Sequence, residues 1–595
     1  MSIKRCLLLN IDLTQGEIIM KKNDKALMFF LLIISFFMFF ILNRIALIYE
    51  RTNGDILSRV KITIENILTD IADKPLMIGT SKTCIIAGLI GTALLWLIYF
   101  YNVAGRKKYM HGIEHGSAEW GSPSDISNFI DKEFRNNILL TKTERLSMSD
   151  RMKRTKYDDY NRNKHVLVIG GTGSGKTRNY AMVNLMQMHS NYVIVDPKGK
   201  IVHETGKMLT ENGYMIKVLD LVEREQSDKY NPFKYMRTAD DILKLINNII
   251  ANTNTPQSKS AGDFWEKAET ALLEAIFGYV LFETQEHERT IATAMELLRL
   301  AEVKEDNEDY KSALDIIFDE LRTINPNHFA VKQYDIYKFA AGRTAKSILV
   351  SLGVRMAPFN IDSISNIVSG DTLGLDMIGT EKTALFVILP DTDKSFNFLA
   401  AMMFQQMFDV LVYKADREYF GKLPHHVRCI IDEFANIGQI PMLEVLISTI
   451  RSRGISLNII LQNLAQIKSL YKDTWEIITG NCESLLYLGG MEHSTHEYIS
   501  KLCGKTTIDN KNISESKGQV GSYSLNYQIL GRDLITPDEV GRLKRMECIL
   551  IINGCKPFRS RKYELTEHVN YKYLAEFNME NWFRTEDREL CHRRE

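Results

Sequence analysis

The sequence lacks the residue patterns of a disulfide framework and of a zinc site. Its eight cysteines are scattered through 595 residues, and no C-x-x-C pair occurs among them. This usage is typical of a reduced, cytosolic body, because small secreted domains use cysteine in disulfide frameworks. The absence of an H-E-x-x-H motif excludes a membrane-anchored protease of the zinc-dependent kind.

Net charge is also missing, and with it any global preference for an acidic or a basic partner. Lys plus Arg and Asp plus Glu number 74 each, so contact with DNA would have to come from a local patch. One candidate is the basic cluster of Arg151, Lys153, Arg154 and Lys156, although such runs are more often solvated surface. The sequence has no low-complexity tract or long proline-rich linker, which indicates a chain of packed domains.

Two long apolar runs stand at the front of the chain. Residues 26–42 (ALMFFLLIISFFMFFIL) contain no charged side chain, and a second run covers residues 85–101 (IIAGLIGTALLWLIYFY). Each approaches the ~17–25 residues that a helix needs to cross the hydrocarbon layer, and neither has the polar stripe of a buried globular helix. We predict transmembrane helices over residues 26–49 and 83–104, joined by an extracytoplasmic loop over residues 50–82.

The charged flanks of these runs predict their orientation. Residues 21–25 include three lysines and residues 106–108 are all basic, whereas the loop between the runs mixes both signs evenly. Basic flanks stay on the cytoplasmic side, so we expect a two-pass protein of the inner (cytoplasmic) membrane with both termini in the cytoplasm. No small-residue cleavage site follows the first run, which is atypical of a signal peptide. Met20, followed by two lysines, would be a more conventional start for such an anchor than Met1.

Short apolar strands alternate with helical segments after residue 105. Strand-like runs occur at residues 165–169, 192–195, 215–219, 383–389, 427–431, 457–461, 485–488 and 548–552. Continuous apolar strands between helices are typical of a parallel sheet covered on both faces, which predicts an α/β fold.

A glycine-rich phosphate loop follows the first of these strands directly. Eight residues fit G-x-x-x-x-G-K-[ST]: Gly170, Gly171, Thr172, Gly173, Ser174, Gly175, Lys176 and Thr177. Glycines let backbone N–H groups turn around phosphate oxygens, and the following helix adds a positive N-terminal potential. Lys176 would reach the β- and γ-phosphates of ATP, and the Thr177 hydroxyl would ligate Mg²⁺. A glycine-rich turn without a ligand is the plain alternative, and the flanking strand and helix argue against it.

Hydrolysis also needs an acidic residue at the end of a second buried strand. The sequence VRCIIDE at residues 427–433 supplies two. Asp432 would hold Mg²⁺ through water, and Glu433 would orient or deprotonate the attacking water. Acidic pairs after strands are common, so this prediction depends on their combination with the phosphate loop.

Further polar residues are candidates for the chemistry. Gln462 ends the strand LNIILQ, where it would sense the γ-phosphate or simply cap the strand. Arg451 and Arg453 precede that strand; either would act as an arginine finger on a neighbouring subunit's nucleotide, and a solvated helix end is an equally good interpretation. Asp196–Gly199 (DPKG) lies on the same sheet edge as the phosphate loop, as a nucleotide-linked motif or a plain turn.

Helical periodicity interrupts the strands over residues 239–358. We therefore predict an all-α domain over that range, inserted between two parts of one nucleotide-binding domain at residues 105–238 and 359–570. Residues 571–595 form a short C-terminal tail of mixed charge, without an evident acidic or basic receptor segment.

These motifs resemble the coupling proteins of type IV secretion in bacterial conjugation, the TraG/TraD-like family. The similarity covers most of the body: HGSAEWG, the phosphate loop, VDPKG, YNPF, FVILPD, IDEFANIGQIP, the SRGIS-to-ILQN stretch and LITPDEV. The acidic motif that continues into F-x-N-I-G-x-I-P is the most specific part. The resemblance implies a membrane-anchored homo-oligomer, a hexameric ring of RecA-like domains. It also implies that ATP hydrolysis delivers single-stranded DNA with its relaxase or other relaxosome proteins, or a protein effector, to components of the secretion channel.

Two other functions remain open at this point. A chromosome-segregation DNA translocase shares the anchor, the ring and the phosphate loop, but usually brings more spans and a separate DNA-reading domain. A membrane receptor that binds nucleotide without turnover would not need Asp432, Glu433 and Gln462 together. An ABC-type pump is disfavoured because no LSGGQ-like signature lies between the loop and the acidic strand.

Overall fold

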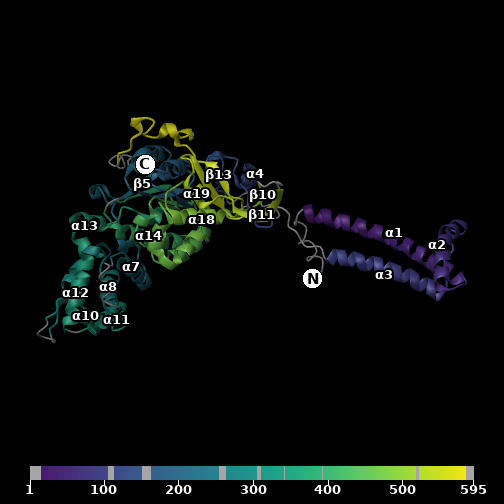
Figure 1. Ribbon diagram of the computed structural model, residues 1–595. Helices are drawn as coiled ribbons and strands as arrows, with labels where there is room; N and C mark the ends of the chain where they lie inside the picture. The colour runs from purple at the N-terminus through teal and green to yellow at the C-terminus, as the bar shows by residue number, and fades with distance from the viewer. Residues whose placement is uncertain are drawn as a thin grey trace. The chain divides into compact units, whose positions relative to one another are not determined.

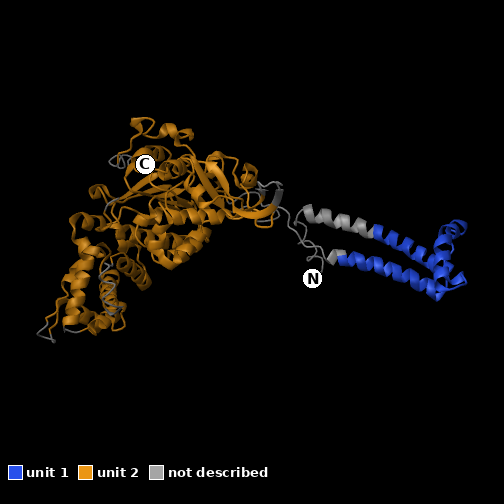
Figure 2. Cartoon of the chain, in the orientation of Figure 1, with its two compact units in different colours: residues 1–111 blue, residues 112–595 orange. Residues whose placement is uncertain are grey.

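The computed structural model describes residues 15–104, 113–149, 162–253, 263–304, 310–340, 342–390, 393–516 and 522–584. The chain divides into two compact units, Met1–His111 and Gly112–Glu595, which are coloured separately in Figure 2. The basic cluster between residues 151 and 156 and the basic flank at residues 106–108 lie outside the described residues.

The first unit is a hairpin of two long helices with a shorter helix between them (Figure 1). These are α1 (Gln15–Arg51), α2 (Ile56–Asp73) and α3 (Lys82–Ala104). Phe30–Arg51 and Lys82–Tyr101 are long and apolar enough to cross a membrane, with mean hydropathies of 2.4 and 2.1. Both predicted spans are therefore helices, whereas α2 occupies a range that the sequence analysis treated only as a loop.

Glycine allows α1 and α3 to pack closely. A Cβ atom on Gly88 would lie 2.6 Å from a ring carbon of Phe39, and one on Gly91 would lie 1.9 Å from a methyl carbon of Leu42. Small residues at such positions let two apolar helices approach without a polar contact.

A nine-stranded sheet forms the centre of the second unit, in the order β13-β12-β9-β3-β8-β7-β4-β6-β5. Its strands are β3 (Val166–Ile169), β4 (Asn191–Asp196), β5 (Met215–Asp220), β6 (Thr383–Ile388), β7 (Val427–Ile431), β8 (Ile455–Leu461), β9 (Ser484–Tyr487), β12 (Glu547–Ile552) and β13 (Phe558–Arg561). The seven strands from β9 to β5 are parallel, as predicted. At one edge β12 runs antiparallel to β9, and β13 returns antiparallel to β12 in a hairpin with a short connection. The apolar run at residues 548–552 predicts one more parallel strand, and this direction is wrong.

The sheet separates two hydrophobic cores, because its central strands are buried on both faces. One face packs against α5 (Met182–Leu185) and α6 (Lys200–Glu211). The other packs against α14 (Asn397–Arg417), α15 (Leu443–Ile450), α16 (Leu464–Tyr471), α17 (Trp475–Gly480) and α18 (His493–Cys503).

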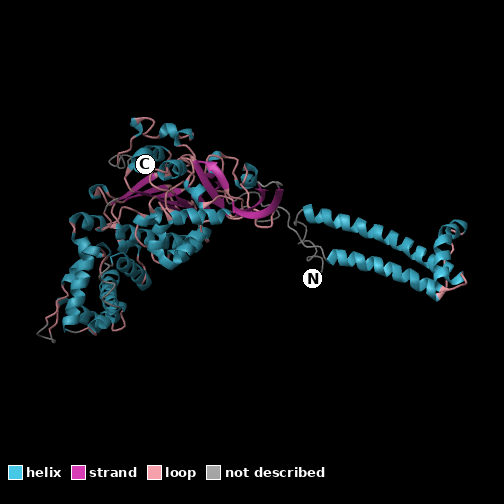
Figure 3. Cartoon of the chain, viewed as in Figure 1, coloured by secondary structure: helices cyan, strands magenta, loops and turns pink. Residues whose placement is uncertain are grey.

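Helices and short turns make up the described part of the chain between β5 and β6 (Figure 3). They are α7 (Ala239–Thr253), α8 (Asp263–Glu283), α9 (Ile291–Arg299), α10 (Ala313–Ile324), α11 (Phe329–Lys338), α12 (Gly342–Met356) and α13 (Asp362–Val368). Apolar side chains of these helices continue the core that covers the α14 face of the sheet. The predicted boundaries of an all-α domain stay a prediction.

A long antiparallel hairpin, β10 (Lys505–Ser516) with β11 (Ser522–Asp533), lies beside the sheet. Residues of the HGSAEWG motif pair with the first residues of β10. The backbone amide of Ala118 donates to the carbonyl of Lys505 over 2.9 Å. A Cβ atom on Gly116 would lie 2.2 Å from that carbonyl oxygen, and Gly116 has a φ of 153°. This motif therefore docks the start of the second unit on the hairpin. Two short strands, β1 (Asn137–Leu139) and β2 (Arg145–Ser147), form a separate ribbon.

Candidate nucleotide site

The phosphate loop connects β3 to the first turn of a helix, as the sequence predicts. This turn, η4 (Thr177–Ala181), is π-helical and leads into α5. Gly173 and Gly175 have φ angles of 73° and 91°, a region that side chains rarely tolerate. A Cβ atom on Gly175 would also lie 1.9 Å from the side-chain oxygen of Asn179. Lys562 holds the loop from outside, since its ammonium donates to the carbonyl of Ser174 over 2.8 Å.

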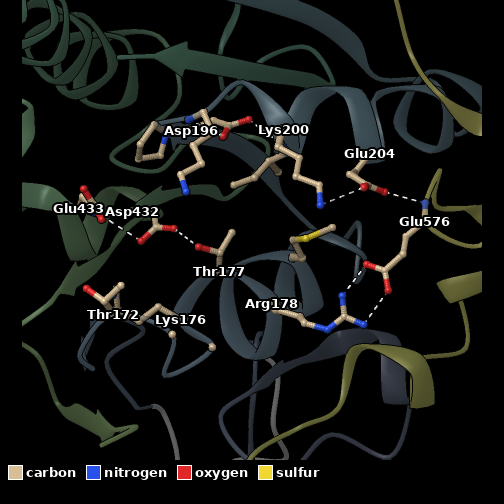
Figure 4. A pocket seen from close by; sticks show the side chains of 16 residues that line it. Thr172, Lys176, Thr177, Arg178, Asp196, Lys200, Glu204, Asp432, Glu433 and Glu576 are labelled. Carbon is tan, nitrogen blue, oxygen red and sulfur yellow. Dashed lines mark hydrogen bonds and ion pairs between the residues drawn. The ribbon is translucent and has the colours of Figure 1, made fainter. Parts of the chain in front are cut away.

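A cavity of about 370 Å³ opens in front of this loop, and Figure 4 shows its lining. Lys176 is nearly buried there, and its ammonium lies 3.3 Å from the carbonyl oxygen of Gly171. Burial lowers the pKa of Lys176, while the carboxylates of Asp432 and Glu433 oppose that shift. The ammonium thus sits at the cavity without a carboxylate directly bonded to it, in a position suited to phosphate oxygens.

Thr177 and Asp432 meet across the cavity although 255 residues separate them. The Thr177 hydroxyl donates to a carboxylate oxygen of Asp432 (Figure 4). Asp432 is buried, and burial raises its pKa, opposed by the contacts with Thr177 and Lys176. A hydroxyl beside a carboxylate at a phosphate loop fits Mg²⁺, which takes few protein oxygens and completes its shell with water and phosphate.

Glu433 follows at the end of β7 in the left-handed backbone region, with a φ of 55°. The side-chain amide of Gln462, from the end of the neighbouring strand β8, donates to one Glu433 oxygen over 3.0 Å. The amide of Asn436 donates to the other oxygen over 2.9 Å. Two amides thus fix the carboxylate between two strand ends, and Asn436 is the asparagine of the F-x-N motif.

Asp196 lies on the same cavity, beyond β7 on strand β4. Its carboxylate accepts the backbone N–H groups of Ile201 and Val202, at 2.5 and 3.2 Å, and so caps the start of α6. Burial raises the pKa of Asp196 to about 6, and the charge of Asp432 adds to the shift. The DPKG segment is a turn whose residues Asp196, Pro197 and Lys198 line the cavity, and its nucleotide-linked role stays a prediction.

Four charged residues on this cavity were not predicted from the sequence: Arg178, Lys200, Glu204 and Glu576. The guanidinium of Arg178 donates to both carboxylate oxygens of Glu576, at 2.5 and 2.6 Å (Figure 4). The amide of Glu576 donates to Glu204 on α6 over 2.7 Å. Glu576 comes from the expected C-terminal tail, and no local pattern reveals a contact that joins residues 398 positions apart.

The two arginines of the finger hypothesis lie at the other end of the sheet. Arg451 and Arg453 form the turn η12 (Arg451–Arg453) before β8 begins, whereas the phosphate loop follows the carboxyl end of the parallel strand β3. Arg453 is bound by Asp416, with guanidinium-to-carboxylate distances of 2.8 and 3.0 Å. Arg451 instead lines a separate cavity, so the structure distinguishes the two arginines but brings neither to this chain's own loop.

A phosphate loop, an acidic strand two positions away in the sheet and a polar residue on the strand between them define a RecA-like P-loop NTPase fold. The family described as Type IV secretory system conjugative DNA transfer matches residues 125–571. This chain belongs to that family, which confirms the resemblance to type IV coupling proteins.

Individual relatives are distant. The conjugal transfer protein TraG of Rhizobium radiobacter is 22% identical over 414 residues, which cover 66% of this chain and 61% of that protein. TraG of Escherichia coli is 25% identical over 500 residues, which cover 77% of this chain and 74% of that protein. The solved structure of the plasmid coupling protein TrwB in complex with the non-hydrolysable ATP analogue ADPNP has a TM-score of 0.54 at 15% identity, and covers 77% of this chain and 96% of TrwB. The chain thus spans about three-fifths of the length of the first relative.

Proposed function

We propose that this protein is a membrane-anchored, Mg²⁺-dependent ATPase that serves as the coupling protein of a conjugative type IV secretion system. The observation that carries the proposal is the convergence of Thr177, Asp432, Glu433 and Gln462 from three parts of one sheet. A protein that only binds nucleotide has no need of a carboxylate fixed by two amides next to the phosphate site.

Each residue has a distinct part in the proposed reaction. The loop backbone and Lys176 bind the β- and γ-phosphates; Thr177 and Asp432 would hold Mg²⁺, which would supply positive charge at the phosphates. Glu433 orients the attacking water and accepts its proton. Gln462 donates a hydrogen bond to Glu433 and senses the γ-phosphate, so that the orientation of the Glu433 carboxylate depends on whether this phosphate is present.

A second copy of the chain completes the site. Arg451 lines a cavity of about 580 Å³ with the cationic side chains of Lys164 and Lys422, and with Arg162, which is paired with Glu483 at 2.8 Å. Burial and the charge of Arg451 lower the pKa of Lys164 to about 8. This concentration of positive charge suits the phosphates of a neighbour's nucleotide, so Arg451 rather than Arg453 is the proposed finger of a homo-oligomer, a hexamer.

The apolar helices support a membrane anchor, and family membership supports the assignment of a transported substrate. The helices α1 and α3 cross the inner membrane in two passes with both termini in the cytoplasm. The cargo is single-stranded DNA with its relaxase or other relaxosome proteins, or a protein effector, and the recipient is the type IV secretion channel. Family membership supports this assignment, because the family is described by conjugative DNA transfer.

The test measures ATP turnover by the full chain in lipid nanodiscs, with and without single-stranded DNA. We expect Mg²⁺-dependent turnover that rises with DNA. Glu433→Gln should lower it by about 10²–10⁴-fold while ATP still binds, and Lys176→Ala should lose both turnover and binding. If the wild type binds ATP and never hydrolyses it, with or without DNA, the ATPase proposal fails and a nucleotide-binding receptor replaces it.

A further inference from the structure

The helix α2 carries an apolar sector that stays exposed in the described part of the first unit. Ile56, Leu57, Val60, Ile64 and Leu68 are 74%, 81%, 44%, 69% and 79% exposed, respectively. At 3.6 residues per turn these five positions fall within about 120° of the helix circumference. A soluble helix of this composition would bury such a sector against a core.

The opposite side of α2 is polar, and a third side is fixed to the hairpin. Glu65 and Thr69 lie on the exposed polar side. Thr63 is buried, and the guanidinium of Arg59 stacks on the ring of Tyr49 in α1 at 4.3 Å. The three sides therefore have three different environments: one packs on the hairpin, one is exposed and polar, and one is exposed and apolar.

A buried arginine fixes the position of α2 relative to the spans. Arg44, fully buried near the end of the first apolar helix, donates to the carbonyl oxygens of Asp70, Lys74 and Met77 at 2.7–2.9 Å. Its guanidinium also lies 2.9 Å from the carboxylate of Asp70. The carboxyl end of α2 is thus held at the loop end of the hairpin, where Figure 1 shows α2 turned away from the axes of α1 and α3.

We propose that α2 lies in the outer interface of the membrane and buries its apolar sector among the acyl chains of the outer leaflet. This inference rests on the proposed two-span anchor. Only four residues separate α2 from α1 and eight separate it from α3, so the helix stays within the interfacial depth. Leu76 and Ile78, 91% and 51% exposed, continue the apolar surface from α2 to α3.

Lipid fits this sector better than a folded partner does. The sector consists of Ile, Leu and Val side chains, without an aromatic anchor or a polar group that would give a protein partner specificity. A helix with one apolar and one charged face, held beside two spans, has the pattern of an in-plane interfacial helix.

The experiment places a nitroxide on the full chain, reconstituted at one copy per nanodisc, and compares its collisions with O₂ and with a water-soluble nickel chelate. The label is attached through a ketone-bearing amino acid, so the native cysteines remain. Ile64 and Leu68 report the apolar sector, Glu65 and Thr69 are matched controls on the polar side, and Leu94 on α3 reports the span. We expect O₂ collisions to exceed nickel collisions several-fold at Ile64, Leu68 and Leu94, and the reverse at Glu65 and Thr69.

Each other result overturns the inference in a recognisable way. If Leu94 lies in lipid but Ile64 is as open to nickel as Glu65, the anchor stands and the interfacial position of α2 is wrong. If Ile64 is shielded from both reagents, protein covers the sector instead of lipid. If Leu94 itself is open to nickel, the two-span anchor fails and the position of α2 fails with it.

Discussion

Glu433 occupies a backbone conformation that few residues other than glycine adopt. A φ of 55° at a non-glycine residue costs on the order of 1–3 kcal/mol. The amide N–H of Glu433 donates to Asp432 over 3.1 Å, and the amides of Gln462 and Asn436 hold its side chain. These contacts offset the strain of the left-handed backbone and fix the Glu433 carboxylate beside the phosphate loop.

Replacing Gln462 by Leu should lower ATP turnover by about 10–100-fold, because Glu433 loses one of the two amides that orient it. Binding of ATP should change little, since among the described residues the side chain of Gln462 donates to Glu433 and makes no hydrogen bond to the phosphate loop. Asn436→Ala removes the other amide and should also lower ATP turnover. Steady-state kinetics with a separate ATP-binding measurement tests this; a Gln462→Leu variant with unchanged turnover would remove Gln462 from the mechanism.

The pKa of Asp196 predicts a pH-dependent stability. Burial raises this pKa from 3.8 to about 6, so the folded state holds the proton more tightly than the unfolded state. The contribution of Asp196 to the free energy of unfolding is greatest below pH 4 and falls by about 3 kcal/mol as the pH rises to about 6.

In Asp196→Asn this dependence should disappear. The melting temperature of the wild type, relative to that of the variant in the same detergent, should therefore fall as the pH rises through this window. A constant difference between the two proteins would show that Asp196 is ionised throughout.

The local sequence pattern was sufficient to predict that most of the catalytic candidates lie at one edge of the sheet. Lys176, Thr177, Asp432, Glu433 and Gln462 each end a buried strand or begin a helix, and parallel strands bring such ends to one edge of a sheet. The sequence could not predict the partners, because pairs such as Arg178 and Glu576 depend on where distant segments pack.

At the scale of elements, α7 is tied directly to the loop after the acidic strand. The amide of Gln439 donates to the side-chain oxygen of Asn252 over 2.7 Å, and the Asn252 amide donates back to the Gln439 carbonyl over 2.8 Å. A Cβ atom on Gly438 would lie 2.5 Å from that oxygen, so the glycine of the motif makes the contact possible. This pair of hydrogen bonds connects α7 to the loop that follows Glu433 at the end of β7.

Asn252→Ala should release the loop over residues 434–441 without unfolding the sheet. Loss of these hydrogen bonds costs about 1–3 kcal/mol, so amide hydrogen exchange in the loop should rise by one to two orders of magnitude. Exchange in β7 and β8 should stay at the wild-type level. If the loop exchanges as slowly as before, Asn252 does not hold it.

The sequence pattern did not predict two features of the secondary structure, the apolar sector of α2 and the direction of β12. The sector of α2 was missed because charged residues are interspersed among its apolar members, most of which lie three or four positions apart. The antiparallel pairing of β12 with β9 was missed because a buried strand has the same apolar run in either direction.

At the scale of the whole molecule, the position of Arg451 predicts that one copy completes the site of another. Lys176→Ala and Arg451→Ala should each abolish turnover when alone, since an arginine finger contributes about 10³–10⁵-fold. Mixed assemblies of the two variants should regain part of the activity, because some interfaces combine an intact loop with an intact finger. Arg453→Ala is the matched control and should retain turnover. If mixing restores nothing and Arg451→Ala alone is active, the finger assignment is wrong.

The most direct test of the account is the identity of the nucleotide that stays bound after the full chain is incubated with Mg²⁺ and ATP. The wild type should convert its bound ATP to ADP, Glu433→Gln should retain ATP unchanged, and Lys176→Ala should hold neither. If the wild type retains ATP as Glu433→Gln does, the site binds nucleotide without hydrolysis, and the account of this protein as a motor ATPase is contradicted.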